Sequence, residues 1–257
     1  MLPLNSGARL LHKMILTGSL FALIATLYSS VGHAGASGYL AVMALLSFQP
    51  EIIKPTSLVL NIIVAAIASC NFIRNGYFDK KIFFPLIITS IPAAFLGGYL
   101  HLSPEYFKIF AGIFLICSAL LLVGKQFLKS QAELVREVPY SMSLVAGAVI
   151  GFISGLIGVG GGIFLSPLLI LTNWSDVKKT SGIAALFILV NSIAGLAGHV
   201  ISFKSFDPNI LYWIVAVAIG GITGSYLGTM RFDKKIITLC LFLILLSAGV
   251  KFIVTSM

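Results

Sequence analysis

The chain has 257 residues, of which 58% are hydrophobic and 10% are charged, and its mean hydropathy is +1.06. A soluble domain carries roughly 25% charged residues, so this composition excludes a water-soluble globule and predicts an integral membrane protein. The net charge of +9 is explained by the lysines and arginines of cytoplasmic loops, and it gives no reason to expect nucleic acid as a partner.

Six apolar stretches have the length of a membrane-spanning helix. Each contains about 18–23 residues, near the ~20 that a helix needs to cross ~30 Å of hydrocarbon. They are, in chain order, 55–73, 82–101, 107–124, 180–202, 210–229 and 236–254. Two others, 14–48 and 142–171, are too long and too rich in glycine to be simple spans. The predicted fold class is an all-α polytopic membrane protein embedded in the lipid bilayer.

Two parts of the sequence match each other. From Gly38 to Thr56 is 18 positions, and from Gly162 to Thr180 is also 18. The matched segments are "VGHAGASGYL" (31–40) with "IGVGGGIFL" (157–165), "KPTSLVL" (54–60) with "KKTSGIA" (178–184), and "GGYL" (97–100) with "GSYL" (224–227). The shared spacing makes an internal repeat a better explanation than chance.

The repeat divides the chain into a first copy (1–124), a polar linker (125–139) and a second copy (140–257), which together form one transmembrane domain. Arg9 and Lys13, followed by an apolar run, also resemble a secretory signal. We reject that interpretation because the matched segment makes this region part of the folded protein. Internal repeats around interrupted helices are typical of secondary transporters; the alternative is a duplication with only structural consequences.

The glycine-rich stretch 142–171 is predicted to be interrupted. One continuous helix would be ~45 Å long, well beyond the thickness of the hydrocarbon core. A break at Gly158–Gly162 leaves a second arm, 163–172, that covers ~15 Å, or half of the bilayer. Two such half-spans form a re-entrant hairpin. The corresponding break in the first copy lies at Gly32–Gly38.

The loop charges test this hairpin, with Lys54 counted in the loop before 55–73. If both long stretches return to the side on which they start, most of the 17 lysines and arginines fall on one side, as the positive-inside rule expects. Each half then has three full crossings, so the two repeats are inverted. If only 142–171 returns to the side on which it starts, the excess of lysine and arginine on one side of the membrane is larger. The two halves then no longer have the same number of crossings. We favour the symmetric arrangement and leave open whether 14–48 is one span or a hairpin.

The interruption itself points to a binding site. Free N–H groups and the positive end of the helix dipole come together where the second arm begins, and glycine lets an anion reach the backbone. Close helix packing through small residues is the alternative, but it does not require the three successive glycines Gly160–Gly162. All eight acidic residues fall in loops or the linker, so none is placed for a cation, a metal or a proton relay. The sequence predicts a small anion as the ligand and no cofactor.

The candidate binding residues lie at the two breaks and on the spans that follow them. His33 can bind the anion, exchange a proton or be a structural residue held by the backbone. Thr56 and Thr180, each followed by serine, are natural N-cap residues or supply hydroxyls to a cavity. Asn61 and Asn191 line the path or bond across helices. The complete set is Gly32, His33, Gly35, Ser37, Gly38, Thr56, Asn61, Ser154, Gly158, Gly160, Gly161, Gly162, Thr180 and Asn191.

The motif "GFISGLIGVGGGIFLSPLLIL" (151–171), its degenerate counterpart "SSVGHAGASGYLAVMAL" (29–45) and the following "KKTS" resemble the sulfite exporter TauE/SafE family over essentially the whole chain. The first copy departs from the motif, with "HAGAS" in place of the glycine run. The resemblance implies a multi-pass carrier of the bacterial inner membrane that exports sulfite or moves related sulfur-containing anions such as sulfonates. We expect alternating access between the two repeats.

Other functions compete with an anion permease. Cys70, Cys117 and Cys240 lie in three different spans, which disfavours a thiol relay for thiosulfate. An intramembrane enzyme needs a nucleophile with its base, or metal ligands, and the four histidines are scattered with no acid at their depth, so we predict no enzyme activity. A non-transport intramembrane subunit is the remaining class. A carrier this small is compatible with a homodimer, which nothing in the sequence demonstrates.

Overall fold

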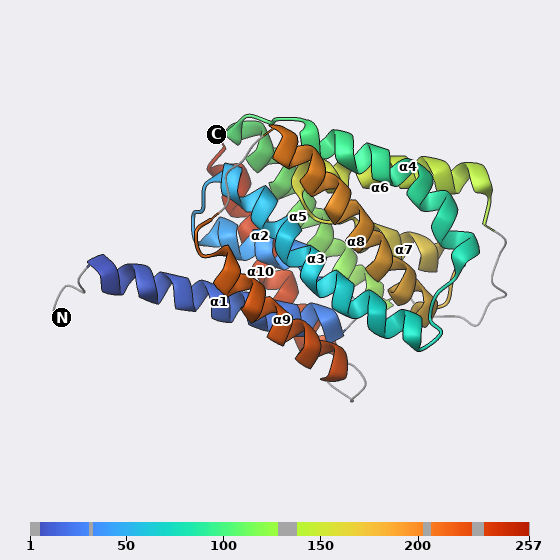
Figure 1. Cartoon of the computed structure of the whole chain (residues 1–257), viewed down its shortest axis with the longest axis horizontal. Coiled ribbons are helices and arrows are strands. Elements are labelled where there is room, and N and C mark those ends of the chain that lie inside the picture. Colours follow the sequence, from blue (N-terminus) through green and yellow to red (C-terminus); the bar gives the residue numbers. More distant parts are fainter. Residues whose placement is uncertain (1–5, 31–32, 128–137, 203–206, 228–233, 257) are drawn as a thin grey trace.

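The computed structural model describes residues 6–30, 33–127, 138–202, 207–227 and 234–256. All regular structure in these ranges is α-helical (Figure 1). The helices are α1 (Ser6–Ser30), α2 (Ala36–Leu45), α3 (Pro50–Arg74), α4 (Lys80–Tyr99), α5 (Pro104–Phe127), α6 (Tyr140–Ile157), α7 (Gly162–Leu171), α8 (Val177–Ser202), α9 (Ile210–Leu227) and α10 (Lys234–Val254). Within the described ranges, α3, α4, α5, α6 and α8 each contain a stretch long and apolar enough to cross a membrane. The all-α polytopic prediction is confirmed.

Each predicted span forms one helix, and the two long glycine-rich stretches each form two. The stretch 142–171 is divided into α6 and α7, with the second arm at Gly162–Leu171 against the predicted 163–172. The stretch 14–48 is divided into α1 and α2. A long helix, a ten-residue helix and three further long helices therefore occur in the same order in α1–α5 and in α6–α10.

The start of α3 corrects a sequence prediction. The helix begins at Pro50 rather than at 55, with Gln49 in an extended conformation before it. Proline fits the first helical position because the N–H that it lacks would have had no partner there. Lys54, Thr56 and Ser57 consequently lie inside the helix and are buried. The N-cap interpretation of Thr56 and Ser57 is wrong, and so is the assignment of Lys54 to a loop.

The second copy of this motif is corrected in the same way. The carboxylate of Asp176 accepts hydrogen bonds from the backbone N–H groups of Lys178 and Lys179, at 3.0 and 2.9 Å. Asp176 therefore caps α8. Thr180 and Ser181 lie inside the helix and do not cap it.

Helix α6 packs along α4 through a row of glycines. Three glycines spaced four residues apart lie where an added Cβ would overlap the backbone of α4. The facing pairs are Gly147 with Leu86, Gly151 with Ser90, and Gly155 with Ala94. The numbers rise together, so the two helices run in the same direction. Small-residue packing thus explains the part of the glycine-rich stretch that precedes the break.

The same contact occurs between α1 and α9. Gly220 and Gly224 lie against the backbone of Ala22 and Thr26, again in parallel, and Ser29 Oγ donates to the carbonyl of Gly221 at 2.8 Å. In the internal repeat, α1 of the first copy corresponds to α6 of the second, and α4 corresponds to α9. Each half therefore provides one helix to each of these pairs, so the halves are intertwined.

The corresponding helices α3 and α8 lie side by side and run in opposite directions. Lys54 near the start of α3 lines the same cavity as His199 near the end of α8. At the other end, Gly182 of α8 lies against Tyr77, just beyond α3. Helices α5 and α10 are also antiparallel, because Gly112 packs on residues 249 and 253 and Gly249 packs on residues 112 and 116.

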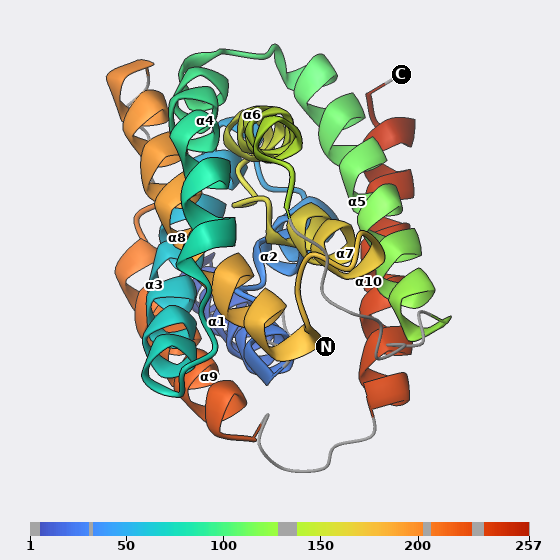
Figure 2. The ribbon, with the colours of Figure 1, turned by 90° about the vertical axis from the view of Figure 1, so that its right-hand side faces the viewer.

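The two ten-residue helices occupy the middle of the bundle. Helices α2 and α7 lie between α5 and α10 on one side and α3, α4 and α8 on the other (Figure 2). Helix α2 buries all of its residues except Leu45. A short apolar helix that is buried on every side belongs to a protein core, and its position brings both interruptions to the interior.

Candidate functional site

The second break is a four-residue turn between α6 and α7. The N–H groups of Gly158 and Val159 both donate to the carbonyl of Ser154, at 2.8 and 3.1 Å, and so end α6. Gly158, Gly160 and Gly161 have φ of 89°, 76° and 79°, the left-handed region that glycine enters without strain. The sequence predicted this break correctly, and the backbone shows why glycine is needed there.

The amides at the start of α7 are available to a ligand. Gly161 is the N-cap residue and provides no side-chain cap. Within the part of the chain that the structure describes, no protein group accepts a hydrogen bond from the N–H groups of residues 160–163. Such groups, together with the positive end of the helix dipole, favour a bound anion.

The first break has the same arrangement with a different sequence. The N–H of His33 donates to the carbonyl of Tyr28 at 2.9 Å, and Gly35, with φ of 94°, is the uncapped N-cap residue of α2. The N–H groups of residues 35–38 likewise have no acceptor among the described residues. Gly32, another predicted site residue, lies outside the described residues.

The two breaks meet at one small pocket. Its volume is about 10 Å³, room for about one water molecule. Its lining residues are Tyr28, His33, Ala34, Gly35, Ala36, Ser37, Asn61, Phe114, Val159, Gly162, Ile163 and Ile188. Residues that carry uncapped amides, from both helix starts, therefore face the same space.

Two side-chain hydrogen bonds fix the pocket wall. His33 Nε2 and Ser166 Oγ are 3.1 Å apart, which joins the first break to α7. Tyr28 Oη and Ser37 Oγ are 2.8 Å apart, which joins α1 to α2 within the first copy.

Helix α3 reaches both breaks. Asn61 is fully buried, and its Nδ2 donates to the carbonyl of Val159 at 3.3 Å and to Ser192 Oγ at 2.9 Å. Its Oδ1 is buried with no hydrogen-bond partner. One turn earlier, Ser57 Oγ donates to the carbonyl of Ala36 at 3.3 Å. Asn61 thus fixes the second break, and Ser57 contacts the first.

The other predicted residues divide into two groups. Gly38 packs on Ile24 and Tyr28, and Ser154 is buried with its Oγ unpaired, so both lie beside the breaks. Thr56, Thr180 and Asn191 lie on the following spans, outside the breaks. None of these three lines the pocket, and neither do Gly38, Ser154, Gly158, Gly160 and Gly161. Both threonines are buried with an unpaired hydroxyl, and Asn191 Nδ2 donates to Phe187 O on its own helix, at 2.8 Å.

Sequence reasoning missed Tyr28, Ser166, Ser192 and Lys54. The first three are single hydroxyls on apolar helices, and only the packing of α1, α7 and α8 brings them to the breaks. Lys54 had a detectable signal, because Lys54, Ser57 and Asn61 have the spacing of one helix face. Taking Pro55 as a helix boundary concealed that spacing.

The sulfite exporter TauE/SafE family model matches residues 17–252, which is nearly the whole chain. The chain belongs to the sulfite exporter TauE/SafE family. It is 37% identical to the probable membrane transporter protein y4hK of Sinorhizobium fredii, over 90% of this chain and 94% of that protein. It is 29% identical to the probable membrane transporter protein YjnA of Bacillus subtilis, over 90% and 96%. No solved structure matches the chain.

These TauE/SafE relatives are named as membrane transporters, which agrees with a multi-pass protein rich in apolar helices. Their names give no substrate. The chemistry of the ligand therefore has to be argued from the two breaks.

Proposed function

We propose that this protein is a secondary transporter of the bacterial inner membrane that moves small sulfur-containing anions, most directly sulfite or a sulfonate, by alternating access. The observation that carries the proposal is the pocket shared by two helix starts with uncapped amides. An anion held there would receive hydrogen bonds from both repeats at once. The family supplies the substrate class.

The chemistry of the pocket wall supports an anion over a cation. No Asp or Glu is among the lining residues, whereas hard cations are bound through carboxylates and carbonyl oxygens. The polar groups present are backbone amides, the hydroxyls of Tyr28 and Ser37, the imidazole of His33 and the amide of Asn61. Hydroxyl and amide donors suit the oxygens of a sulfur oxyanion.

The helix directions support inverted repeats made of 1–124 and 140–257, joined by the linker 125–139. Two helices related by a two-fold axis along the membrane normal would point the same way. The corresponding pairs α3/α8 and α5/α10 are antiparallel, which supports an axis in the membrane plane. Inverted repeats of this kind are common among secondary transporters.

The size of the pocket supports a closed resting state. A volume of about 10 Å³ admits a water molecule but not a four-atom oxyanion. Substrate binding therefore requires α2 and α7 to separate, which breaks the contact between His33 and Ser166. Movement of one structural unit against another around a central site is the usual basis of alternating access.

The test is flux into proteoliposomes that contain the purified protein, with labelled sulfite, taurine, thiosulfate and sulfate supplied separately. We expect saturable transport of sulfite or a sulfonate. The variant Gly161→Leu should be inactive, because its side chain would occupy the approach to the α7 amides and meet Ile150 and Phe187. Thermal unfolding in detergent establishes that the variant protein used is folded. Absence of saturable flux for every one of these anions would reject the substrate class.

A further inference from the structure

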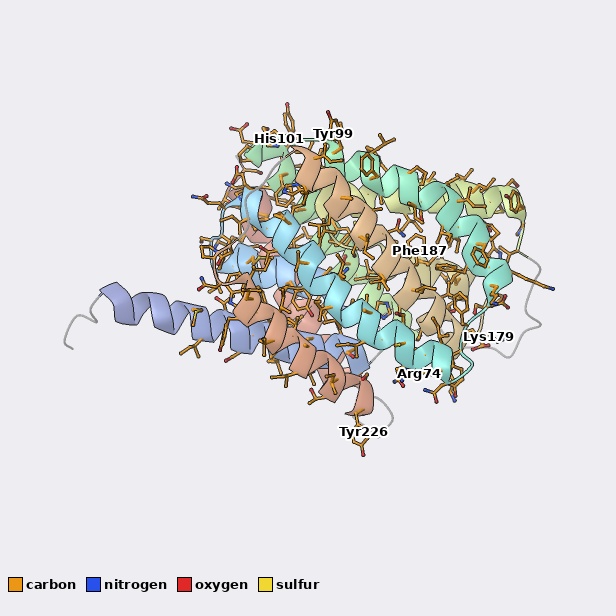
Figure 3. The ribbon with its side chains drawn as sticks, in the orientation of Figure 1. Arg74, Tyr99, His101, Lys179, Phe187 and Tyr226 are labelled. Carbon is orange, nitrogen blue, oxygen red and sulfur yellow. The ribbon has the colours of Figure 1, made fainter. Side chains whose placement is uncertain are left out.

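A second cavity lies at the end of α3 where the helix starts, and Leu156, just before the second break, is part of its wall. Its volume is about 30 Å³, room for about two water molecules. Six of its lining residues are Lys54, Leu100, His101, Leu102, Leu156 and His199. His101 lies at one end of the bundle, opposite Arg74 and Lys179 (Figure 3). The cavity is therefore close to one end of the bundle.

Lys54 is the unusual residue of this cavity. It lies in the second turn of α3, and only 6% of its surface is exposed. Its Nζ donates to the carbonyls of Gly97, Gly98 and Leu100, at 3.2, 2.9 and 3.4 Å. These are the last carbonyls of α4, where the negative end of the helix dipole stabilises a cation.

The charge of Lys54 has no carboxylate partner in the described structure. Its hydrogen bonds all go to carbonyl oxygens. Glu51, one turn earlier, is the single carboxylate among the lining residues, and it is exposed. Buried charges are normally paired with an opposite charge, and a cavity next to a buried ammonium is where a mobile anion can provide that pairing.

Lys54 also contacts the second break directly. A Cβ added to Gly158 would lie 3.0 Å from Lys54 O and 3.1 Å from its Cγ. Asn61, which holds the next residue of the break, lies two helical turns further along the same face of α3, about 10 Å away. Lys54 therefore stands between the cavity and the pocket where the two breaks meet.

We propose that the Lys54 cavity is a second anion site, which takes the transported oxyanion before it reaches the glycine breaks. This inference rests on the proposed function for the identity of its ligand. The ammonium remains bonded to the α4 carbonyls and attracts the anion through its charge, while its fixed position keeps the site beside Gly158.

Among the described residues, a buried lysine occupies this position of the repeat in the first copy only. Lys178 occupies the position that corresponds to Lys54, but it is exposed, and its Nζ lies 5.2 Å from the centre of the Tyr77 ring. Lys178 is therefore a matched control. It has the same charge and the same place in the repeat, but it is exposed.

The first experiment measures the concentration dependence of sulfite flux in proteoliposomes. The variants are Lys54→Gln, Lys54→Met and Lys178→Gln. We expect both Lys54 variants to raise KM about tenfold, because a focused charge raises local anion concentration by at least this factor, and we expect Lys178→Gln to stay within twofold. Glutamine can still donate to the α4 carbonyls, so restoration of wild-type KM by Lys54→Gln would overturn the proposal in favour of a purely structural role.

The second experiment measures binding, so that it does not depend on transport. Sodium sulfite is titrated calorimetrically into the purified Gly161→Leu protein in detergent, with sodium chloride at matched ionic strength as the control. We expect binding that Lys54→Gln abolishes and Lys178→Gln leaves unchanged. Binding that is absent, or that is insensitive to Lys54→Gln, overturns the proposal. Failure of the glycine-break function would instead appear as a wild-type protein without flux that still binds sulfite at Lys54.

Discussion

The two breaks differ in what holds them. In the first, Tyr39 Oη donates to the carbonyl of Ala34 at 2.9 Å and Ser57 Oγ donates to the carbonyl of Ala36, and both side chains belong to the same half as the break. In the second, the carbonyl of Val159 is held by Asn61, which belongs to the other half. The backbone carbonyls of the first break are thus held from within its own half, and its bond to the other half runs through the side chains of His33 and Ser166. The second break has a backbone carbonyl that is itself held by the other half.

This difference assigns different roles to two similar motifs. A relative movement of the halves changes the Asn61 contact with Val159 directly and leaves the contacts of Tyr39 unchanged. We therefore expect the second break to couple movement to binding and the first to supply a more rigid wall. Matched substitutions in the two breaks can test that expectation.

The largest difference is expected between Gly160→Ala and Gly35→Ala. Both place alanine at a positive φ, which costs about 1–3 kcal/mol. At Gly35 the new Cβ would lie 3.0 Å from the Tyr39 side chain, whereas at Gly160 it would overlap Asn61 and lie 2.7 Å from Ile188 and 2.9 Å from Ser192 Oγ. The tighter site makes the overpacking cost, about 1–3 kcal/mol, larger at Gly160. Sulfite flux in proteoliposomes should fall at least about tenfold more for Gly160→Ala. Equal losses would show that the two breaks are equivalent.

The second prediction compares the loss of flux on removing each of the two side chains that bond to carbonyls of the breaks, Asn61 and Ser57. Asn61→Ala leaves the carbonyl of Val159 without its partner, a loss of about 1–3 kcal/mol for a buried group, so we expect flux to fall about 5- to 100-fold. Ser57→Ala removes a single 3.3 Å hydrogen bond, without the second bond of 2.9 Å that Asn61 makes to Ser192, and should change flux less than about threefold. Thermal unfolding in detergent identifies a variant that is merely unstable. A larger loss for Ser57→Ala would reverse the assignment of roles.

A smaller effect on transport is expected from the hydrogen bond that joins His33 in the first break to Ser166 in α7. Ser166→Ala removes the contact with His33, worth about 1 kcal/mol for a neutral hydrogen bond. Because this bond holds the pocket closed, its loss should favour the open state and lower KM for sulfite about fivefold. Tyr28→Phe removes a bond inside the first copy and should leave KM within twofold. An unchanged or higher KM for Ser166→Ala would contradict a closing role.

The smallest effect is expected from the cysteines, which lie outside both breaks. Cys70 and Cys117 are exposed thiols, and neither lines the pocket; the side chain of Cys240 lies outside the described residues. A protein with all three replaced by alanine should transport sulfite and thiosulfate within about twofold of wild type. Selective loss of thiosulfate flux in this variant would establish the thiol relay.

The sequence was sufficient for the features that depend on local chemistry. The glycine run predicted where α6 ends and α7 begins, because glycine adopts a positive φ without strain whatever surrounds it. Local rules failed at Thr56 and Thr180. The predicted spans begin at Pro55 and Thr180, whereas α3 begins at Pro50 and α8 at Val177, so both threonines lie inside their helices. The different positions of Asn61 and Asn191 were not predictable, because the partners of Asn61 are 98 and 131 residues away.

The pairing of α1 with α9 has a consequence for how the protein is made. Ser29 bonds to a residue 192 positions later, so α1 leaves the ribosome and enters the membrane long before its partner has been synthesised. Contacts of such separation form late in folding. Until then the face of α1 that packs on α9 has to be covered by lipid or by the insertion machinery, and a chain truncated before α9 would leave that face without its partner.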